Sequence, residues 1–400
     1  MTTTNTVVDY VKSAPRWVGN AMAYTSTTLH GYTMAAAEYL GAEVGQSAVA
    51  PVADTTVLVP ETLPPPVPTT VVESMLATAC SIKRTVFQLH WSVAPFFWIG
   101  CASVVGYVGT ILFQNLVLDL FPVNLKKKYN AEWGLVTGAS SGIGKAMAEK
   151  LAGQGINVVL VALDDDVLTH TFAEIQQKFP NIQFRKVGVN LGGPEAGYMP
   201  AIIKATNDIH VTLVFNNAGF ITTGFFDKTP LGRSMANFHC NATCILPITH
   251  HFLTKMVASK SKGLLAYTSS SAGFVPTPLS VIYPSTKSFI TLFATSLAPE
   301  VKSRGVDVVV VHPSPMMTNF FKNSGGMQTL EAFKRFAVGP SVIADVVFNS
   351  AGRFVVRDQG LVTILLRIVT KAFDFNLFSE LVCRTAHTTG DFKQFMDKNN

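Results

Sequence analysis

A tyrosine and a lysine stand one helical turn apart in the stretch VIYPSTKSF, residues 281–289. Tyr283 lies four positions before Lys287, so both side chains would lie on one face of a helix. A phenol has an ordinary pKa of about 10 and exchanges protons near neutral pH only where a neighbour, such as an ammonium, favours its anion. Pro284 fits a helix that begins near Tyr283, because a proline in the first turn leaves no hydrogen bond unmade. The pair suggests a proton-transfer site, although the spacing alone also arises by chance.

A glycine-rich turn could bind a dinucleotide. The stretch TGASSGIGKAMAEKLAGQG begins at Thr137 directly after an apolar run and opens an expected helix. Gly138, Gly142 and Gly144 lie in the bend, where glycine lets the backbone approach a pyrophosphate. The N-terminus of the helix offers unpaired N–H groups and partial positive charge to the same anion.

From Trp133 onward, short apolar runs alternate with helical segments. The expected strands are residues 134–138, 157–162, 183–189, 211–216, 263–269 and 306–312. Repeated strand-helix units predict a parallel sheet covered on both faces. Since such crossovers are right-handed, we expect an α/β fold with a doubly wound, Rossmann-type sheet.

Four ordered motifs resemble the short-chain dehydrogenase/reductase family. They are the glycines spaced as TGxxxGxG, NNAG at residues 216–219, Ser270 thirteen residues before Tyr283, and Lys287. The resemblance covers about residues 133–353, more than half of the chain. Within the family, YPSTK and a greasy segment before the domain resemble the membrane-bound 3-ketoacyl-CoA reductases and the related steroid 17-beta dehydrogenases.

The resemblance implies a catalytic set of Asn241, Ser270, Tyr283 and Lys287. Tyr283 would donate the proton to a carbonyl oxygen, and Lys287 would favour the tyrosinate and hydrogen-bond the nicotinamide ribose. Ser270 would hydrogen-bond the substrate oxygen as charge develops; Ser269 and Ser271 are rivals, and the family's spacing favours Ser270. Asn241, in CNATCILPIT, matches the asparagine that holds a water next to the lysine, or is an ordinary polar helix residue.

The same resemblance implies a set of residues that bind NADP(H) or NAD(H). They are Gly138, Ser140, Ser141, Gly142, Ile143, Gly144, Asp164, Asn190, Asn217, Ala218, Gly219, Tyr283, Lys287 and Thr318. Thr318 lies in VHPSPMMTNFF, which is similar to the family's PG-x-x-x-T segment except that Ser314 replaces the glycine.

The sequence does not decide between the two cofactors. Ala162 holds the usual acidic position and Leu163 the usual arginine position, and three aspartates, residues 164–166, follow. The family resemblance implies NADPH, but these carboxylates would repel a 2′-phosphate, and Ser141 supplies no cation in the glycine turn. At least one aspartate should instead cap the next helix. We expect weak discrimination, with room for a lean toward NADH.

The composition predicts a membrane protein. Hydrophobic residues make up 48% of the chain and charged residues only 14%. The stretch 91–118 contains no Asp, Glu, Lys or Arg and is long enough to span a bilayer as a helix. A buried core helix is the alternative. Lysines 126–128 follow this stretch and Lys83 and Arg84 precede it, so the charge bias places the catalytic domain in the cytosol only weakly. The endoplasmic reticulum is the expected membrane, with an organelle membrane as the alternative.

The net charge of +6 does not indicate nucleic-acid binding, because no recognition-helix, zinc-finger or aromatic-plus-basic pattern accompanies it. Five cysteines, odd in number and irregularly spaced, argue against a disulfide framework. Cys240 and Cys244 with His239, His250 and His251 cannot easily converge on one ion from a single helix, so we expect no metal site.

We expect four regions along the chain. They are an N-terminal extension with a Pro-rich linker, residues 1–90; the transmembrane helix, 91–118; the dehydrogenase/reductase domain, 131–355; and a C-terminal amphipathic helical segment, 356–400. Residues 361–383 form a hydrophobic stretch that carries Arg367, Lys371 and Asp374. These charges favour a helix at the membrane surface or at a homodimer face over a membrane-spanning helix, and a buried core helix is a further alternative. The sequence assigns no function to the extension.

Phe320, Phe321, Met327, Phe333 and Phe336 make the segment after Thr318 apolar. They suggest either a long apolar substrate or core packing. The leading hypothesis is a membrane-anchored enzyme that reduces a lipid ketone, most readily a 3-ketoacyl-CoA in fatty-acid elongation. The alternatives are a steroid, retinoid or other lipid-alcohol dehydrogenase, and a non-catalytic scaffold subunit that keeps the fold.

Overall fold

A computed structural model describes residues 69–315, 326–334 and 337–399 of the chain. The chain divides into two units, Met1–Ala79 and Cys80–Asn400, and the sheet lies in the second. Of the first unit the structure describes only the beginning of helix α4 (Thr69–Leu116).

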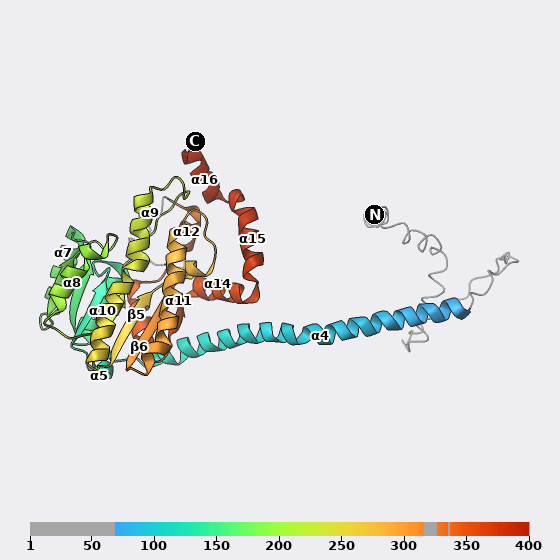
Figure 1. Cartoon of the computed structure of the whole chain (residues 1–400), viewed down its shortest axis with the longest axis horizontal. Helices are drawn as coiled ribbons and strands as arrows, with labels where there is room; N and C mark the ends of the chain where they lie inside the picture. Colours follow the sequence, from blue (N-terminus) through green and yellow to red (C-terminus); the bar gives the residue numbers. More distant parts are fainter. Residues whose placement is uncertain (1–68, 316–325, 335–336, 400) are drawn as a thin grey trace, which may run out of the picture. The chain divides into compact units, whose positions relative to one another are not determined.

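A seven-stranded sheet forms the centre of the second unit, in the order β3-β2-β1-β4-β5-β6-β7 (Figure 1). The strands are β1 (Trp133–Thr137), β2 (Asn157–Ala162), β3 (Phe184–Gly188), β4 (Val211–Asn216), β5 (Gly263–Thr268), β6 (Val306–Pro313) and β7 (Val356–Gln359). Every neighbouring pair is parallel. The predicted doubly wound parallel fold is therefore confirmed, and β7 is a strand that the sequence pattern did not predict.

Helices cover both faces of the sheet, which is why the central strands are apolar without alternation. Leu135 and Val136 are neighbours on β1, point to opposite faces, and are both fully buried. One face packs against α6 (Gly142–Gly153), α7 (Asp166–Lys178) and α13 (Pro340–Ser350). The other face packs against α8 (Met199–Thr206), α10 (Ile245–Ala258) and α11 (Ile282–Lys302).

The strand order reverses between β1 and β4, because β2 and β3 lie to one side of β1 and β4 to β7 to the other. In open α/β sheets, ligands bind at the carboxyl ends of the strands beside such a reversal. The glycine turn follows β1 and the NNAG motif overlaps the end of β4. The topology therefore brings together two motifs that are far apart in the sequence.

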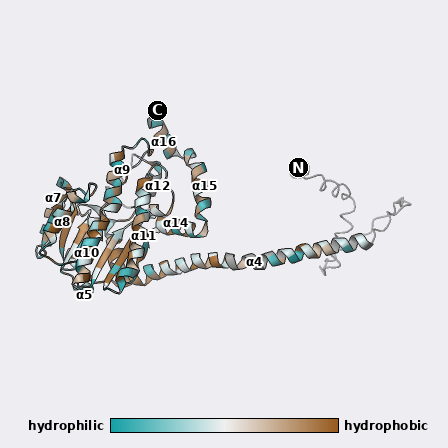
Figure 2. Ribbon diagram, viewed as in Figure 1, coloured by the Kyte–Doolittle hydropathy of each residue, from teal (hydrophilic) through white to brown (hydrophobic). Residues whose placement is uncertain are grey.

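Helix α4 is much longer than the expected span and begins at Thr69. Among the described residues, one stretch, Phe97–Leu120, is long and apolar enough to cross a membrane, with a mean hydropathy of 1.6 (Figure 2). Only 17% of its most apolar part is buried. Trp98 and Ile99 are about two-thirds exposed, at 66% and 67%, which does not fit the alternative of a buried core helix.

The C-terminal part of α4 packs against the edge of the sheet. Tyr107 Oη donates to Asp358 Oδ2 of β7 at 2.8 Å. The fully buried Arg357 pairs with Asp119, just beyond α4, at 3.1 Å. The apolar helix therefore ends in direct contact with the folded domain.

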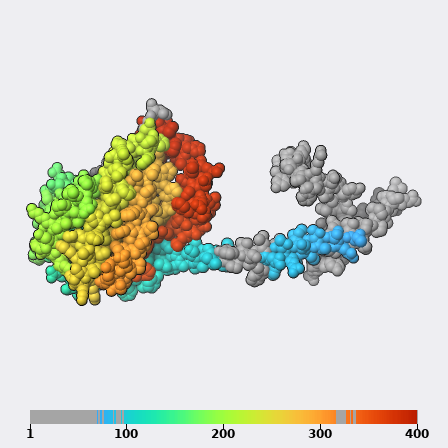
Figure 3. Space-filling view, in the orientation of Figure 1, coloured from blue at the N-terminus to red at the C-terminus, as the bar shows by residue number. Residues whose placement is uncertain are grey.

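Three helices follow β7, namely α14 (Leu361–Ala372), α15 (Phe375–Thr385) and α16 (Gly390–Asn399). In the space-filling view they form a red surface beside the orange segment that includes α11 (Figure 3). Helix α14 packs against η4 (Ser271–Phe274) and β7, whereas α15 has no buried residue.

Candidate active site

The turn after β1 has the backbone that a glycine-rich anion site requires. Gly138 and Gly142 have φ angles of 64° and 57°, in the left-handed region that side chains disfavour. A Cβ on Gly144 would lie only 2.2 Å from the carbonyl oxygen of Gly138. The first turn of α6 carries no acidic residue, and the N-cap Ser141 makes no side-chain capping bond. The N–H groups at this helix end are thus left for a bound anion.

A chain of hydrogen bonds joins this turn to Lys287. Thr137 Oγ1 accepts from the backbone N–H groups of Asn217 and Ala218 at 2.9 and 3.0 Å. Thr268 Oγ1 donates to Asn217 Oδ1 at 3.0 Å, and Lys287 Nζ donates to the Thr268 carbonyl at 2.8 Å. The bonds cross β1, β4 and β5 to α11, so the glycine turn and the Tyr-Lys helix are held in one frame.

Tyr283 and Lys287 lie together at the start of α11, which begins at Ile282 as Pro284 requires. Lys287 is 3% exposed, and its ammonium lies 5.5 Å from the centre of the Tyr283 ring. Burial raises the pKa of Tyr283 to about 12, against a hydrogen bond with Ser270 that lowers it. Burial also lowers the pKa of Lys287 to about 8. At neutral pH the phenol is therefore protonated and able to donate.

The structure separates Ser270 from its two rivals. Ser269 is buried, and its hydroxyl bonds to the Lys287 carbonyl at 2.7 Å and to Thr291 at 2.8 Å. Ser271 is also buried, at 6% exposure. Ser270 is half-buried and shares a hydrogen bond with the phenol of Tyr283. Of the three serines, Ser270 is the one placed beside the tyrosine hydroxyl.

Asn241 is fully buried in a π-helical turn, η3 (His239–Thr243), and such turns are frequent at functional sites. Its amide holds the backbone of Phe220, accepting from the N–H at 2.9 Å and donating to the carbonyl at 2.9 Å. A Cβ on Gly219 would lie 3.2 Å from Asn241 Oδ1 and 3.5 Å from Lys287 Nζ. Asn241 thus lies near Lys287 and fixes the loop after β4, and its expected contact with a water stays a prediction.

The acidic run after β2 divides into two kinds of residue. Asp165 is the N-cap of α7 and accepts from Leu168 N at 2.9 Å, which confirms that part of the run caps a helix. Asp164 is largely exposed, and its Oδ1 lies 3.9 Å from Lys186 Nζ. Leu163 is 55% exposed. Lys186 therefore offsets part of the negative charge where a ribose phosphate would lie.

The remaining expected cofactor residues lie at the strand ends or outside the described residues. The carbonyl of Ser140 accepts from Thr171, and Ile143 packs on the core beneath α6. Asn190 is exposed beyond β3, where its side chain accepts from Gly192 N at 2.9 Å. Thr318 lies outside the described residues.

Ser314, which stands where the family has glycine, joins the end of β6 to α14. Its hydroxyl accepts from Thr363 N at 3.1 Å, and its backbone N–H donates to the Gln359 carbonyl at 2.9 Å. A Cβ on Gly360, whose φ is 85°, would lie 2.4 Å from Ser314 Oγ. The substitution is thus accommodated by a glycine elsewhere in the fold.

A buried polar network behind α11 was not predicted from the sequence. His312 Nδ1 lies 2.8 Å from Asp358 Oδ1, and its Nε2 lies 2.9 Å from Thr291 Oγ1, which donates to the Lys287 carbonyl at 2.9 Å. Arg367 and Tyr107 also bond to Asp358. Burial alone would raise the pKa of Asp358, but hydrogen bonds from His312 and Arg367 outweigh it and hold that pKa well below its ordinary value. The network links the apolar helix α4 to the backbone of the Tyr-Lys helix.

Cys240, which is half-buried, and Cys244, which is buried, lie near the site as free thiols. Burial raises the pKa of the Cys240 thiol to about 11, which disfavours the thiolate that a metal would need. Within the described ranges, no group of three or more His, Cys, Asp or Glu side chains is placed to hold a metal ion.

Comparison with known proteins matches this chain to one family. The profile of the family described as short chain dehydrogenase matches residues 132–329. A very-long-chain 3-oxoacyl-CoA reductase from Homo sapiens is 30% identical over 237 residues, which cover 56% of this chain and 74% of the relative. A 7beta-hydroxysteroid dehydrogenase from Collinsella aerofaciens is 28% identical over 232 residues, covering 58% of this chain and 86% of the relative.

Solved structures give the same match. A 7beta-hydroxysteroid dehydrogenase structure superposes with a TM-score of 0.58 at 26% identity, covering 65% of this chain and 99% of that one. A short-chain dehydrogenase from Sphingobium yanoikuyae in complex with NADPH superposes with a TM-score of 0.51 at 27% identity, covering 56% and 87%.

The lowered pKa of Lys287 predicts a pH dependence of folding. Between pH about 8 and 10.5 the unfolded chain binds a proton at this lysine that the folded chain does not, so the free energy of unfolding rises with pH. Relative to Lys287→Met, the wild-type protein should gain about 2 kcal/mol between pH 7 and 9.5. The measurement is unfolding of both detergent-solubilised proteins across this range, with Lys204→Met on the exposed surface of α8 as the control. A constant difference between wild type and Lys287→Met would contradict the assignment.

Proposed function

The chain belongs to the short-chain dehydrogenase/reductase family and is an oxidoreductase, and we propose that it reduces the ketone of a long-chain 3-oxoacyl-CoA in fatty-acid elongation. The observation that carries the chemistry is the protonated, buried Tyr283 beside Ser270 and one turn before Lys287. The substrate class rests on the relatives named very-long-chain 3-oxoacyl-CoA reductase and on the apolar helix before the domain.

The cofactor is NADP(H) or NAD(H), and the residues present fit it. The left-handed glycines of the β1 turn and the uncapped N-terminus of α6 suit a pyrophosphate. Gly219 lies close to both Asn241 and Lys287, since a Cβ there would be 3.2 Å from Asn241 Oδ1 and 3.5 Å from Lys287 Nζ. We assign the pyrophosphate to the residues 138–144 and the nicotinamide end to the side of Lys287. When bound, the cofactor supplies the hydride to the ketone carbon.

The chain itself supplies the proton and holds the ketone oxygen. Tyr283 donates its phenolic proton to this oxygen as negative charge develops, and Ser270 donates a second hydrogen bond to the same atom. Lys287 then stabilises the tyrosinate that remains, because its ammonium is buried close to the ring. Because burial raises the pKa of Tyr283 to about 12, the phenol carries its proton at neutral pH and can act as the donor when the ketone is reduced.

We assign the protein to a membrane, the endoplasmic reticulum first, with α4 as the anchor and the domain in the cytosol. The exposed apolar residues of α4 support the anchor. The lysines 126–128 support the orientation less than their number suggests, because two of them bond to the domain itself. Lys126 and Lys128 donate to the backbone carbonyls of Gly155 and Ala351 and so attach the segment after α4 to the domain.

A steroid ketone is the second candidate substrate. The observation that favours it is the 7beta-hydroxysteroid dehydrogenase relative, of which the chain covers 86%. The proton-transfer residues would act in the same way on either ketone. The choice between the two substrates would therefore depend on the residues that bind the rest of the substrate molecule.

Replacing the phenol tests the catalytic assignment. Tyr283→Phe keeps the ring and Lys287 but removes the proton donor, so turnover should fall about 100-fold to 10,000-fold while cofactor affinity stays nearly unchanged. Tyr198→Phe, which removes another buried tyrosine hydroxyl, is the matched control and should stay active. Near-normal turnover by Tyr283→Phe would refute the assignment.

Cofactor preference should respond to the charges after β2. Leu163→Arg combined with Asp164→Ser should shift preference toward NADPH by at least about 1 kcal/mol, or about fivefold. The double variant adds a cation at position 163 and removes an exposed carboxylate at position 164, both near the 2′-phosphate. The ratio of kcat/KM for NADPH and NADH measures this, with Ile203→Arg on α8 as a charge control. A wild-type enzyme that already prefers NADPH strongly and a double variant that changes nothing would disprove the electrostatic explanation.

Membrane insertion by α4 should survive alkaline extraction. The protein should stay in the membrane pellet after carbonate treatment without detergent, since an apolar span is not held by charge. Ile99→Lys with Val105→Lys places two charges on exposed positions of α4, at about 2.5 to 3.5 kcal/mol each in a bilayer, and should release a large fraction. Release of the wild-type protein by carbonate would exclude the anchor.

A further inference from the structure

Helix α15 has apolar side chains on two sides yet buries none of its residues. One stripe lines a cleft and recurs at helical spacing, namely Phe375, Ser379, Val382 and Cys383 of α15 together with Ala386 directly after the helix. On the other side, Leu377 and Leu381 are more than half exposed, at 63% and 56%. The helix is therefore not held in place by a packed core of its own.

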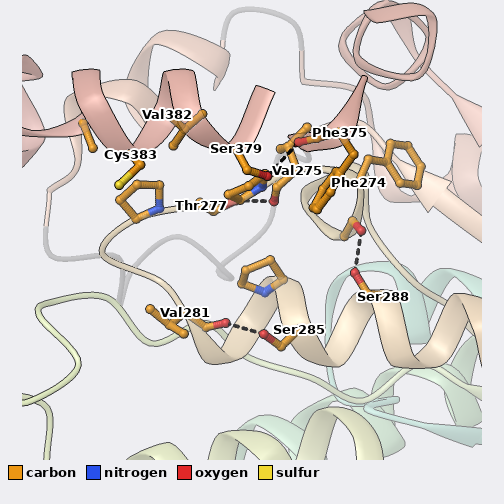
Figure 4. Close-up of a pocket in the computed structure, with 15 residues that line it drawn as sticks. Phe274, Val275, Thr277, Val281, Ser285, Ser288, Phe375, Ser379, Val382 and Cys383 are labelled. Carbon is orange, nitrogen blue, oxygen red and sulfur yellow. Dashed lines mark hydrogen bonds between the residues drawn. The ribbon is translucent and has the colours of Figure 1, made fainter. Parts of the chain in front are cut away.

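The cleft beneath α15 has a volume of about 460 Å³, which lies within the range of small-molecule sites. Its opposite wall is the segment 273–278 together with the first turns of α11 (Figure 4). In this view Phe375 and Ser379 of α15 lie toward Phe274 and Val275 of this segment, and Cys383 lies toward Thr277. The walls thus come from two parts of the chain about one hundred residues apart.

The surface of the cleft is apolar although four of its residues carry hydroxyl groups. Each hydroxyl donates to a backbone carbonyl of its own wall: Thr277 to Val275, Ser285 to Val281, Ser288 to Gly273 and Ser379 to Phe375. Among the residues that the structure describes, no charged side chain lines the cleft. A ligand there would meet carbon and sulfur, with no hydroxyl donor left over, which suits a hydrocarbon chain.

The cleft adjoins the proposed catalytic residues. Its wall begins at Gly273, three residues after Ser270, and includes Pro284, the residue after Tyr283. Helix α14, which precedes α15, contacts the apolar helix α4, because Lys371 Nζ of α14 lies 5.7 Å from the centre of the Tyr107 ring. The residues that line the cleft therefore include close sequence neighbours of Ser270 and Tyr283 on one wall and residues of α15 on the other.

We propose that the cleft between α15 and the segment 273–278 binds the hydrocarbon tail of the substrate, a long unbranched acyl chain. The proposal rests on the proposed function for the identity of the substrate. It assigns to α15 the task of selecting chain length. The exposed side of α15 then faces the lipid from which such a chain arrives.

Filling the cleft should change chain-length selectivity. Ala386→Trp should lower kcat/KM for 3-oxopalmitoyl-CoA about tenfold or more, which is about 1.4 kcal/mol, and leave acetoacetyl-CoA within about twofold. Thr385→Trp adds the same ring at the neighbouring exposed position outside the cleft and should change neither value. Equal effects of Ala386→Trp on both substrates would overturn the proposal. Dissociation of a dimer by this variant, with an equal loss for both substrates, would also overturn it and would identify the cleft as a subunit interface.

A binding measurement tests the cleft without turnover. Cys383 lines the cleft, and the exposed Cys80 on α4 serves as an internal control in the same protein. Palmitoyl-CoA, which has no ketone to reduce, should slow maleimide labelling of Cys383 several-fold and leave Cys80 unchanged, whereas butyryl-CoA should protect neither. Unchanged labelling of Cys383 would reject the cleft even if the enzyme reduces 3-oxoacyl-CoA. Protection of Cys383 in a protein that reduces no 3-oxoacyl-CoA would instead reject the proposed function and keep the acyl-chain site.

Discussion

The buried ammonium of Lys287 is the group on which the arrangement of the site depends. A charge with 3% exposure is costly unless it is hydrogen-bonded, and its partner is the Thr268 carbonyl at the end of β5. Through Thr268 and Asn217 the same bond chain reaches Thr137 and the glycine turn. The distance between the proposed proton donor and the cofactor turn is therefore set by the sheet itself. Burial acts on both groups in opposite directions, raising the pKa of Tyr283 and lowering that of Lys287.

The sequence predicted the parts of the fold in which apolar residues dominate. Five of the six predicted strands have both faces covered and appear as apolar runs, whereas β3 carries Arg185 and Lys186 and is only partly buried. Strand β7 was missed because two of its four residues are Arg357 and Asp358, whose burial depends on partners on α4 and β6. The same tertiary contacts explain why the His312 network could not be predicted, since one of its hydrogen bonds joins residues 251 positions apart. Ser270, Tyr283 and Lys287 could be named from spacing, and the contacts of the Ser269 and Ser270 hydroxyl groups agree with the choice of Ser270.

The apolar content of the chain is divided between a packed core and surfaces that stay exposed. Residues of β1 to β6 account for the first, with Leu135, Phe215 and Val309 fully buried. Helix α4 and the outer sides of α14 and α15 account for the second. Helices α4 and α14 meet where Tyr107 and Arg367 bond to Asp358. Asp358 is connected through His312 and Thr291 to the backbone carbonyl of Lys287. An enzyme that takes its substrate from a membrane would benefit from such an arrangement, because the apolar tail and the reacting ketone then reach adjoining parts of one domain.

Turnover of the two substrate classes by the purified full-length protein tests the central claim most directly. The measurement compares 3-oxopalmitoyl-CoA with a steroid ketone, each with NADPH and with NADH, in detergent or lipid discs. We expect reduction of 3-oxopalmitoyl-CoA with a kcat/KM at least about tenfold above that of the steroid ketone with either cofactor. Preference for the steroid ketone, or no reduction of the 3-oxoacyl-CoA with both cofactors, would contradict it.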